Sequence, residues 1–280
     1  MRIINASEIT KTVAEMCISA NCYLNKDIQS ALTAAEKDEE SPVGRGVLAD
    51  LLRNAQIAAQ QEIPICQDTG MAVFFVEIGS EVYVEGGCLT DAINQGVASG
   101  YTDGYLRKSV VADPLRRKNT EDNTPAVIHY DFVPGDRLKI TFAPKGFGSE
   151  NKSALRMLNP SDGLAGVEEF VVETVRKAGA NPCPPMVVGV GIGGTMDMVA
   201  KLAKKALTRD IGQRHPDPFY SDLEAKLLEK INLLGIGPQG LGGSTTALGL
   251  NIEVYPTHIA GLPVAVNINC HATRHTVAVL

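Results

Sequence analysis

The chain has 280 residues, of which 44% are hydrophobic and 21% are charged, a composition that is typical of globular proteins. The formal net charge of −6 at pH 7 argues against a nucleic-acid partner, because phosphate binding requires clustered lysine and arginine side chains. No apolar run approaches the ~18 residues of a membrane span, and no secretion signal follows Met1. We therefore expect a cytoplasmic protein that has no membrane segment.

The first part of the chain, to about residue 62, has the spacing of helices. Apolar side chains recur at intervals of three and four at Ile9, Val13, Met16 and Cys17, which predicts a helix that Ser7 caps. Two more helices are predicted over about 26–37 and 44–61. Cys17 and Cys22 are expected to be small core residues of this region.

Beyond residue 62, predicted strands and helices are interspersed. Strands are expected over 71–78, 81–85, 126–133, 137–142, 185–192, 252–255 and 264–268, and helices over 89–107, 164–177 and 196–207. A further helix should begin at a capping box on Ser221 and end at Gly235. Short turns predict two hairpins, one between 71–78 and 81–85 and one between 126–133 and 137–142. These patterns predict an α/β fold of the mixed α+β type, with residues 1–280 as one domain.

Three cysteines lie in turn-like segments away from any periodic apolar face. Cys66 stands before Gln67-Asp68-Thr69-Gly70, Cys183 is flanked by prolines, and Cys270 precedes His271. The proline neighbours would stiffen the Cys183 turn. Because no Cys-x-x-Cys pair occurs, this pattern alone leaves two interpretations open: a shared metal site, or separate buried thiols. Cys88 has no partner signal and is interpreted as structural.

A glycine-rich segment offers a different function. Gly189, Gly191 and Gly194 match G-x-G-x-x-G between a predicted strand and a predicted helix, with Asp210 at about the distance of a ribose-binding acid. An NAD-dependent dehydrogenase is therefore one alternative, although no strand precedes Asp210 as a dinucleotide fold requires. The start of the following helix, at Gly193 to Thr195, could instead hold a carboxylate.

Several separated segments together resemble one known family, the class I iron–sulfur fumarate hydratases and tartrate dehydratases, and specifically their α subunit. The matching strings are Cys66-Gln67-Asp68-Thr69-Gly70, Gly104-Tyr105-Leu106-Arg107, Asp122-Asn123-Thr124-Pro125-Ala126, Gly148-Ser149-Glu150-Asn151-Lys152, Cys183-Pro184-Pro185 with Gly189 to Thr195, and the stretch from Gly237 to Arg274. Because they occur in the order of the family, they are far more specific together than any one string alone.

The resemblance implies a [4Fe–4S] cluster held by Cys66, Cys183 and Cys270, with one iron that has no protein ligand. Such a cluster departs from the usual four-cysteine set. The resemblance further implies substrate contacts from Gln67, Asp68, Arg107 and the backbone at Gly148. It also makes Asp68 and His258 the two catalytic candidates. The whole chain would then form one cluster-binding domain.

The implied activity is a hydro-lyase reaction that interconverts (S)-malate and fumarate plus water, with tartrate dehydration as the alternative. We favour malate because that reaction is central to metabolism, in the tricarboxylic acid cycle. The sequence stops ten residues after Cys270, so the remaining active-site residues are expected from a β subunit, in an (αβ)₂ assembly. The alternatives from other classes are the NAD-dependent dehydrogenase and a non-enzymatic iron–sulfur module.

Overall fold

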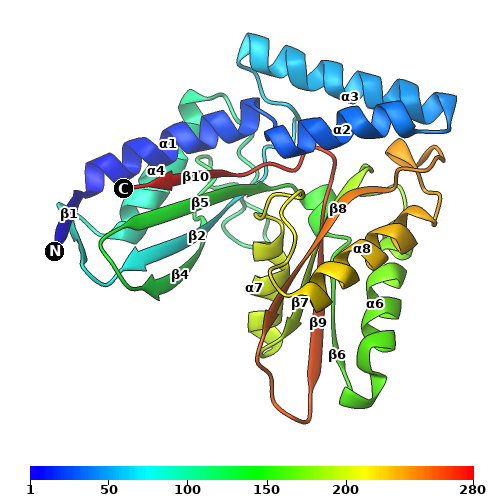
Figure 1. Cartoon of the computed structure of the whole chain (residues 1–280). Coiled ribbons are helices and arrows are strands. Elements are labelled where there is room, and N and C mark those ends of the chain that lie inside the picture. The colour runs from blue at the N-terminus through cyan, green and yellow to red at the C-terminus, as the bar shows by residue number, and fades with distance from the viewer. The chain divides into compact units, whose positions relative to one another are not determined.

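The computed structural model describes all 280 residues and divides them into two compact units (Figure 1). Unit 1 comprises Met1–Leu24, Ala55–Phe147 and Arg274–Leu280, and unit 2 comprises Asn25–Asn54 and Gly148–Thr273. Each unit has its own hydrophobic core. The predicted mixed α/β class is confirmed. That the two units work as one cluster-binding domain stays a prediction.

Unit 1 is built on a four-stranded mixed sheet in the order β10-β5-β2-β4, beside a two-stranded sheet of β1 and β3. Helices α1 and α4 run side by side in this unit, and α1 also contacts β5 and β10 (Figure 1). The elements are β1 (Arg2–Asn5), α1 (Ala6–Cys22), β2 (Met71–Gly79), β3 (Val82–Glu85), α4 (Leu89–Asp103), β4 (Val127–Val133), β5 (Leu138–Lys145) and β10 (Thr276–Val279).

Neither predicted hairpin forms. Strand β3 pairs in parallel with β1, and β2 lies between β4, its parallel neighbour, and β5, its antiparallel neighbour. The connection from β4 to β5 passes the end of β2, where Gly79 N–H donates to Arg137 O at 2.9 Å. A Cβ atom at Gly79 would lie 2.4 Å from Gly135 O, so glycine permits this close crossing.

The N-terminal helix confirms the predicted apolar face but not the predicted cap. Ile9, Val13, Met16 and Cys17 are buried, and Cys22 is buried as well. The N-cap is Asn5, whose Oδ1 accepts from Ser7 N–H at 2.9 Å. Asn at the N-cap satisfies a helix N–H that has no partner within the helix, and Ser7 itself lies within the first turn.

Unit 2 is built on a four-stranded sheet in the order β6-β9-β7-β8. Helix α7 covers one face of this sheet, and α6 and α8 pack on the other (Figure 1). The elements are α2 (Lys26–Asp38), most of α3 (Pro42–Gln61), most of α5 (Phe147–Glu150), β6 (Ala154–Leu158), α6 (Gly163–Ala178), β7 (Met186–Gly193), α7 (Met196–Ala206), α8 (Pro218–Asn232), β8 (Ala247–Tyr255) and β9 (Leu262–Asn269), with 3-10 turns η1 (Pro160–Asp162) and η2 (Pro238–Gly240).

The predicted helices at 26–37, 164–177 and 196–207 and the buried strand at 185–192 are confirmed. The capping box on Ser221 is wrong, because α8 begins at Pro218 and its N-cap is Asp217. The Asp217 side chain accepts from Phe219 N–H at 2.9 Å, and Pro218 occupies the first turn, where its missing N–H costs nothing. The Asp217-Pro218 pair was a stronger sequence signal for the start of this helix than the capping box on Ser221.

A buried carboxylate holds the glycine-rich segment between α8 and β8. Glu39 is fully buried, and it accepts backbone N–H donors from Ser41 at 3.0 Å, Ser244 at 2.8 Å and Thr245 at 2.9 Å. Burial alone would raise the pKa of this carboxyl, but these three donors outweigh it and hold the pKa at about 2. Glu39 therefore remains ionised and fastens the segment to the end of α2.

We expect Glu39→Gln to reduce the stability of unit 2. A pKa of about 2 in the folded state, against the ordinary glutamate value of 4.5, corresponds to about 3 kcal/mol of stabilisation of the ionised form. Because the folded pKa is depressed, this stabilisation is present above pH 4.5 and is lost as the pH falls towards 2. Urea unfolding across this pH range should show the variant less stable at pH 7 and converging on the parent in acid. The exposed neighbour Glu40→Gln is the control, and a difference that does not depend on pH would contradict the prediction.

Candidate functional site

The loop that carries Cys66 connects α3 to β2, and its residue Thr69 ties it to Arg107. The Thr69 hydroxyl accepts from Arg107 N–H at 2.9 Å and donates to Arg107 O at 3.2 Å. Thr69 is buried, whereas the Arg107 side chain is exposed. The backbone of Arg107 is thus fixed beside the loop while its guanidinium group can reach a ligand.

Four buried polar side chains form hydrogen bonds that fix the same loop in place. Tyr101 donates to Thr69 O at 2.7 Å, Asn123 donates to Gly70 O at 3.2 Å, and Arg274 donates to Asp68 O at 3.0 Å and to Asn21 Oδ1 at 2.9 Å. Burial raises the pKa of Tyr101, so its hydroxyl stays a hydrogen-bond donor. These supporting residues were not predicted. No local sequence signal marks them, because Asn123 and Arg274 stand among polar neighbours in the sequence.

Asp68 projects from this loop beside Cys66. Its Oδ1 accepts from Gly70 N–H at 3.1 Å and its Oδ2 accepts from Phe147 N–H at 3.0 Å. Its own N–H donates to Cys66 Sγ at 3.4 Å, and the Cys66 thiol donates to Gln67 Oε1 at 3.5 Å. The structure therefore brings four predicted site residues together in unit 1: Cys66, Gln67, Asp68 and Arg107.

The other two predicted ligands, Cys183 and Cys270, lie in unit 2 on loops that contact each other. Cys183 follows α6 and Cys270 follows β9, and the pairing of Val187 with Asn269 brings the two loops to the same end of the sheet. His271 N–H donates to Cys183 O at 3.3 Å. Cys183 is exposed and Cys270 is half-buried, so both thiols can be reached.

Gly148 is exposed at the start of unit 2, within the single turn of α5. This turn is fixed to β9 through Glu150, which accepts from Asn267 Nδ2 at 2.7 Å and forms an ion pair with Lys204 at 2.5 Å. Ser153 Oγ also accepts from Ile268 N–H at 3.1 Å. The backbone that follows Gly148 is therefore held beside the residues that lead to Cys270.

His258 lies at the opposite end of the unit 2 sheet from both cysteines. It follows β8, whose last residue, Tyr255, pairs with Gly193 at the end of β7, whereas Cys183 precedes the start of β7. Eight residues of β7 span roughly 25 Å. His258 is exposed, and its Nδ1 accepts from Ala260 N–H at 3.2 Å. The structure thus does not bring His258 together with Cys183 and Cys270 as the predicted site requires.

The glycines of β7 serve packing against α7. A Cβ atom at Gly189 would lie 2.2 Å from Ala203 O, and one at Gly191 would lie 2.3 Å from Val199 O. Asp210 follows α7 in a turn and ends no strand. The helix start does hold a carboxylate, but it is the chain's own Asp197, whose pKa is lowered by the Thr195 hydroxyl and by backbone N–H groups. A phosphate would meet this negative charge, which argues against a dinucleotide site.

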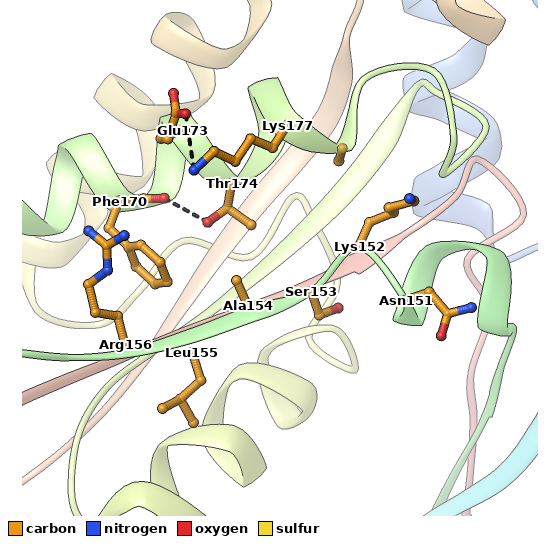
Figure 2. Close-up of a pocket in the computed structure, with 11 residues that line it drawn as sticks. Asn151, Lys152, Ser153, Ala154, Leu155, Arg156, Phe170, Glu173, Thr174 and Lys177 are labelled. Atoms are coloured by element: carbon orange, nitrogen blue, oxygen red, sulfur yellow. Dashed lines mark hydrogen bonds and ion pairs between the residues drawn. The ribbon is translucent and has the colours of Figure 1, made fainter. Parts of the chain in front are cut away.

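A cleft of about 350 Å³ lies in unit 2 between α6 and the segment that leads into β6 (Figure 2). Lys152, Arg156 and Lys177 bring positive charge to it, and its one acid, Glu173, pairs with Lys177 at 3.3 Å. Arg156 lies over the Phe170 ring, with its Cζ 4.9 Å from the ring centroid (Figure 2). The excess positive charge suits the attraction of a small anion.

The three predicted cysteine ligands suit an iron–sulfur cluster, both in the chemistry of their thiolates and in their solvent accessibility. Cys17 and Cys22 are buried in the core, whereas none of the three predicted ligands is buried. No group of three His, Cys, Asp or Glu side chains is spaced to hold a single metal ion. The predicted thiolates come from both units, one from unit 1 and two from unit 2, and thiolates are the usual ligands of such clusters.

Comparison with known proteins gives matches along almost the whole chain. The family model described as fumarate hydratase (Fumerase) matches residues 10–279. The chain is 44% identical over 276 residues to the putative L(+)-tartrate dehydratase subunit alpha of Methanocaldococcus jannaschii, with 96% of each chain covered. It is 35% identical over 272 residues to the L(+)-tartrate dehydratase subunit alpha of Escherichia coli strain K12, with 96% of this chain and 89% of the relative covered. None of the helices is long and apolar enough to cross a membrane.

Proposed function

The chain belongs to the fumarate hydratase family, and from that premise we propose that it is the α subunit of a two-subunit, [4Fe–4S]-dependent hydro-lyase. The observation that carries the proposal is the patch in unit 1 where Cys66, Gln67, Asp68 and Arg107 lie together. A thiolate can hold iron, a carboxylate can accept a proton, and a guanidinium group can bind a substrate carboxylate.

In this proposal Cys66, Cys183 and Cys270 hold the cluster, and one iron has no protein ligand. When bound, the cluster supplies a Lewis acid that lowers the barrier to loss of hydroxide from C2 of the substrate. Support comes from the accessible thiols and from the contact between the Cys183 and Cys270 loops. One of these proposed ligands, Cys66, belongs to unit 1, and the other two belong to unit 2.

The side chains of this subunit would bind the substrate and move its proton. The Arg107 guanidinium is suited to bidentate contact with a substrate carboxylate, and Gln67 and the Gly148 backbone would add hydrogen bonds. Asp68 would take the proton from C3 as the C2 hydroxide leaves, and the products are the unsaturated dicarboxylate and water. The Phe147 and Gly70 N–H groups that fix Asp68 would hold its carboxylate in one orientation.

His258 has no role in this proposal. Its place at the far end of the unit 2 sheet separates it from Cys183 and Cys270 by roughly the length of β7. A catalytic contribution from His258 therefore stays a prediction that this arrangement within unit 2 does not support.

Two substrates have comparable support. The family model favours fumarate and (S)-malate, and the names of the two relatives favour L(+)-tartrate. These substrates differ by one hydroxyl group, which a few hydrogen-bond donors can discriminate. The positive cleft around Lys152 would attract either dianion.

A β subunit would complete the enzyme, because the relatives are named as alpha subunits. We propose that it supplies further substrate-binding residues, that the pair doubles to (αβ)₂, and that the enzyme works in the cytoplasm. The chain alone would then bind the cluster but turn over substrate slowly or not at all.

The test is anaerobic reconstitution of the chain with and without its β subunit, followed by assays of (S)-malate and L(+)-tartrate dehydration. We expect turnover of one substrate by the pair and little by the chain alone. Arg107→Gln should lose dicarboxylate binding while keeping the cluster. If the loaded pair dehydrates neither substrate and Arg107→Gln binds dicarboxylate as the parent does, the protein is an iron–sulfur module and the hydro-lyase proposal is wrong.

A further inference from the structure

We propose that Gln239 is a positioning residue that clamps the Cys183 and Cys270 loops together, so that their thiolates are held ready for iron. The inference rests on the proposed cluster and assigns a role to a residue outside its ligands. Gln239 lies in η2, within the glycine-rich segment between α8 and β8.

The contacts of Gln239 reach both cysteine loops. Its backbone N–H donates to Pro184 O at 2.8 Å, and its side-chain Nε2 donates to the same oxygen at 2.9 Å. Nε2 also lies 3.2 Å from Nδ1 of His271, the residue after Cys270. His271 closes the link, because its backbone N–H donates to Cys183 O at 3.3 Å.

The backbone of Gln239 indicates that its side chain matters. Gln239 has φ +53°, in the left-handed region, and Gly237, Gly240, Gly242 and Gly243 around it also have positive φ. Glycine adopts this conformation freely, whereas a residue with a side chain adopts it at a cost in free energy. A glutamine in the midst of these glycines is therefore best explained by the hydrogen bonds of its amide. Cys183, across the contact, has φ +53° as well.

The segment that carries Gln239 has a fixed base. Gly237 N–H donates to Thr246 Oγ1 at 3.3 Å, and a Cβ atom at Gly237 would lie 2.1 Å from the Gly242 carbonyl carbon. Later in the segment, the Glu39 carboxylate accepts hydrogen bonds from the Ser244 and Thr245 N–H groups. Gln239 therefore connects the cysteine loops to a rigid support.

Groups that orient metal ligands through hydrogen bonds commonly change metal affinity 10–100-fold when they are removed. Without the Gln239 amide, Pro184 O keeps the backbone donor, and the two loops keep the His271 N–H bond to Cys183 O and the pairing of Val187 with Asn269. We expect the thiolates to separate more often, which allows iron to leave the cluster.

The decisive variant is Gln239→Gly, which removes the amide and relieves the positive φ, so the backbone bond to Pro184 O can persist. In the reconstituted chain we expect iron loss to a ferrous chelator to be about 10–100-fold faster than in the parent, with an altered EPR spectrum. The thermal midpoint of the cluster-free protein should change little. Gln239→Glu, which keeps the length but has no amide donor, should also lose iron faster. Exposed Gln213→Ala is the matched control.

The outcomes separate the inference from the proposed function. If the parent forms a cluster and both Gln239 variants lose iron at the parent rate, the clamp is wrong and the hydro-lyase proposal stands. If the parent forms no cluster under any reconstitution condition, both are wrong. If Gln239→Gly fails to fold, Gln239→Glu decides, because its normal iron loss would overturn the clamp.

Discussion

Cys183→Ser, reconstituted with iron and sulfide under anaerobic conditions, is expected to lose the [4Fe–4S] absorbance and EPR signals that the parent shows. A serine hydroxyl does not replace a thiolate, which is the ligand that iron–sulfur clusters use. Only two of the proposed ligands, Cys66 and Cys270, would remain. Activity of the αβ pair should fall to background with the loss of the cluster.

Cys88→Ser is the matched control for this substitution. Cys88 is exposed like Cys183, but it lies at the N-cap of α4 in unit 1 and has no place in the proposed ligand set. It should therefore reconstitute like the parent. A Cys183→Ser chain that keeps a full cluster signal would contradict the proposed ligand set.

Asp68→Asn is expected to lower kcat of the αβ pair by about 10²–10⁴-fold, the usual contribution of a positioned general base. The amide has nearly the same shape but cannot take the C3 proton. Substrate binding by Arg107 does not depend on this carboxylate, so KM should change much less than kcat. The cluster spectrum should remain that of the parent, because Asp68 is not among the proposed ligands.

The control for Asp68→Asn is the exposed residue Asp103 at the end of α4, since Asp103→Asn removes the same charge without touching the loop. The assay should follow solvent-deuterium exchange at C3 as well as dehydration. If Asp68→Asn retained the exchange rate of the parent, the proton would be taken by another residue, and the β subunit would be the place to search for it.

The site was predictable where its residues are neighbours along the chain. Cys66, Gln67 and Asp68 form one short string, so their proximity needs no tertiary structure. Arg107 was identified through resemblance alone, and its fixed place beside the loop depends on the Thr69 hydroxyl. The glycine motif at Gly189 suggested a dinucleotide site that the structure does not support. Close packing of a strand against a helix and close approach of a phosphate both favour glycine, because both need the space that a side chain would fill.

The sequence by itself determined the helices α2, α6 and α7 and the buried strand β7, because apolar spacing, helix ends and unbroken apolar runs are local properties of the chain. It also indicated the three turns that carry Cys66, Cys183 and Cys270, and the family to which the chain belongs. Only the tertiary structure decided that β2 lies between β4 and β5, that His258 lies at the far end of its sheet, and that Glu39 bonds to Ser244 and Gln239 to Pro184. Strand order and these hydrogen bonds join residues far apart in sequence, and local patterns carry no information on which distant groups will pair.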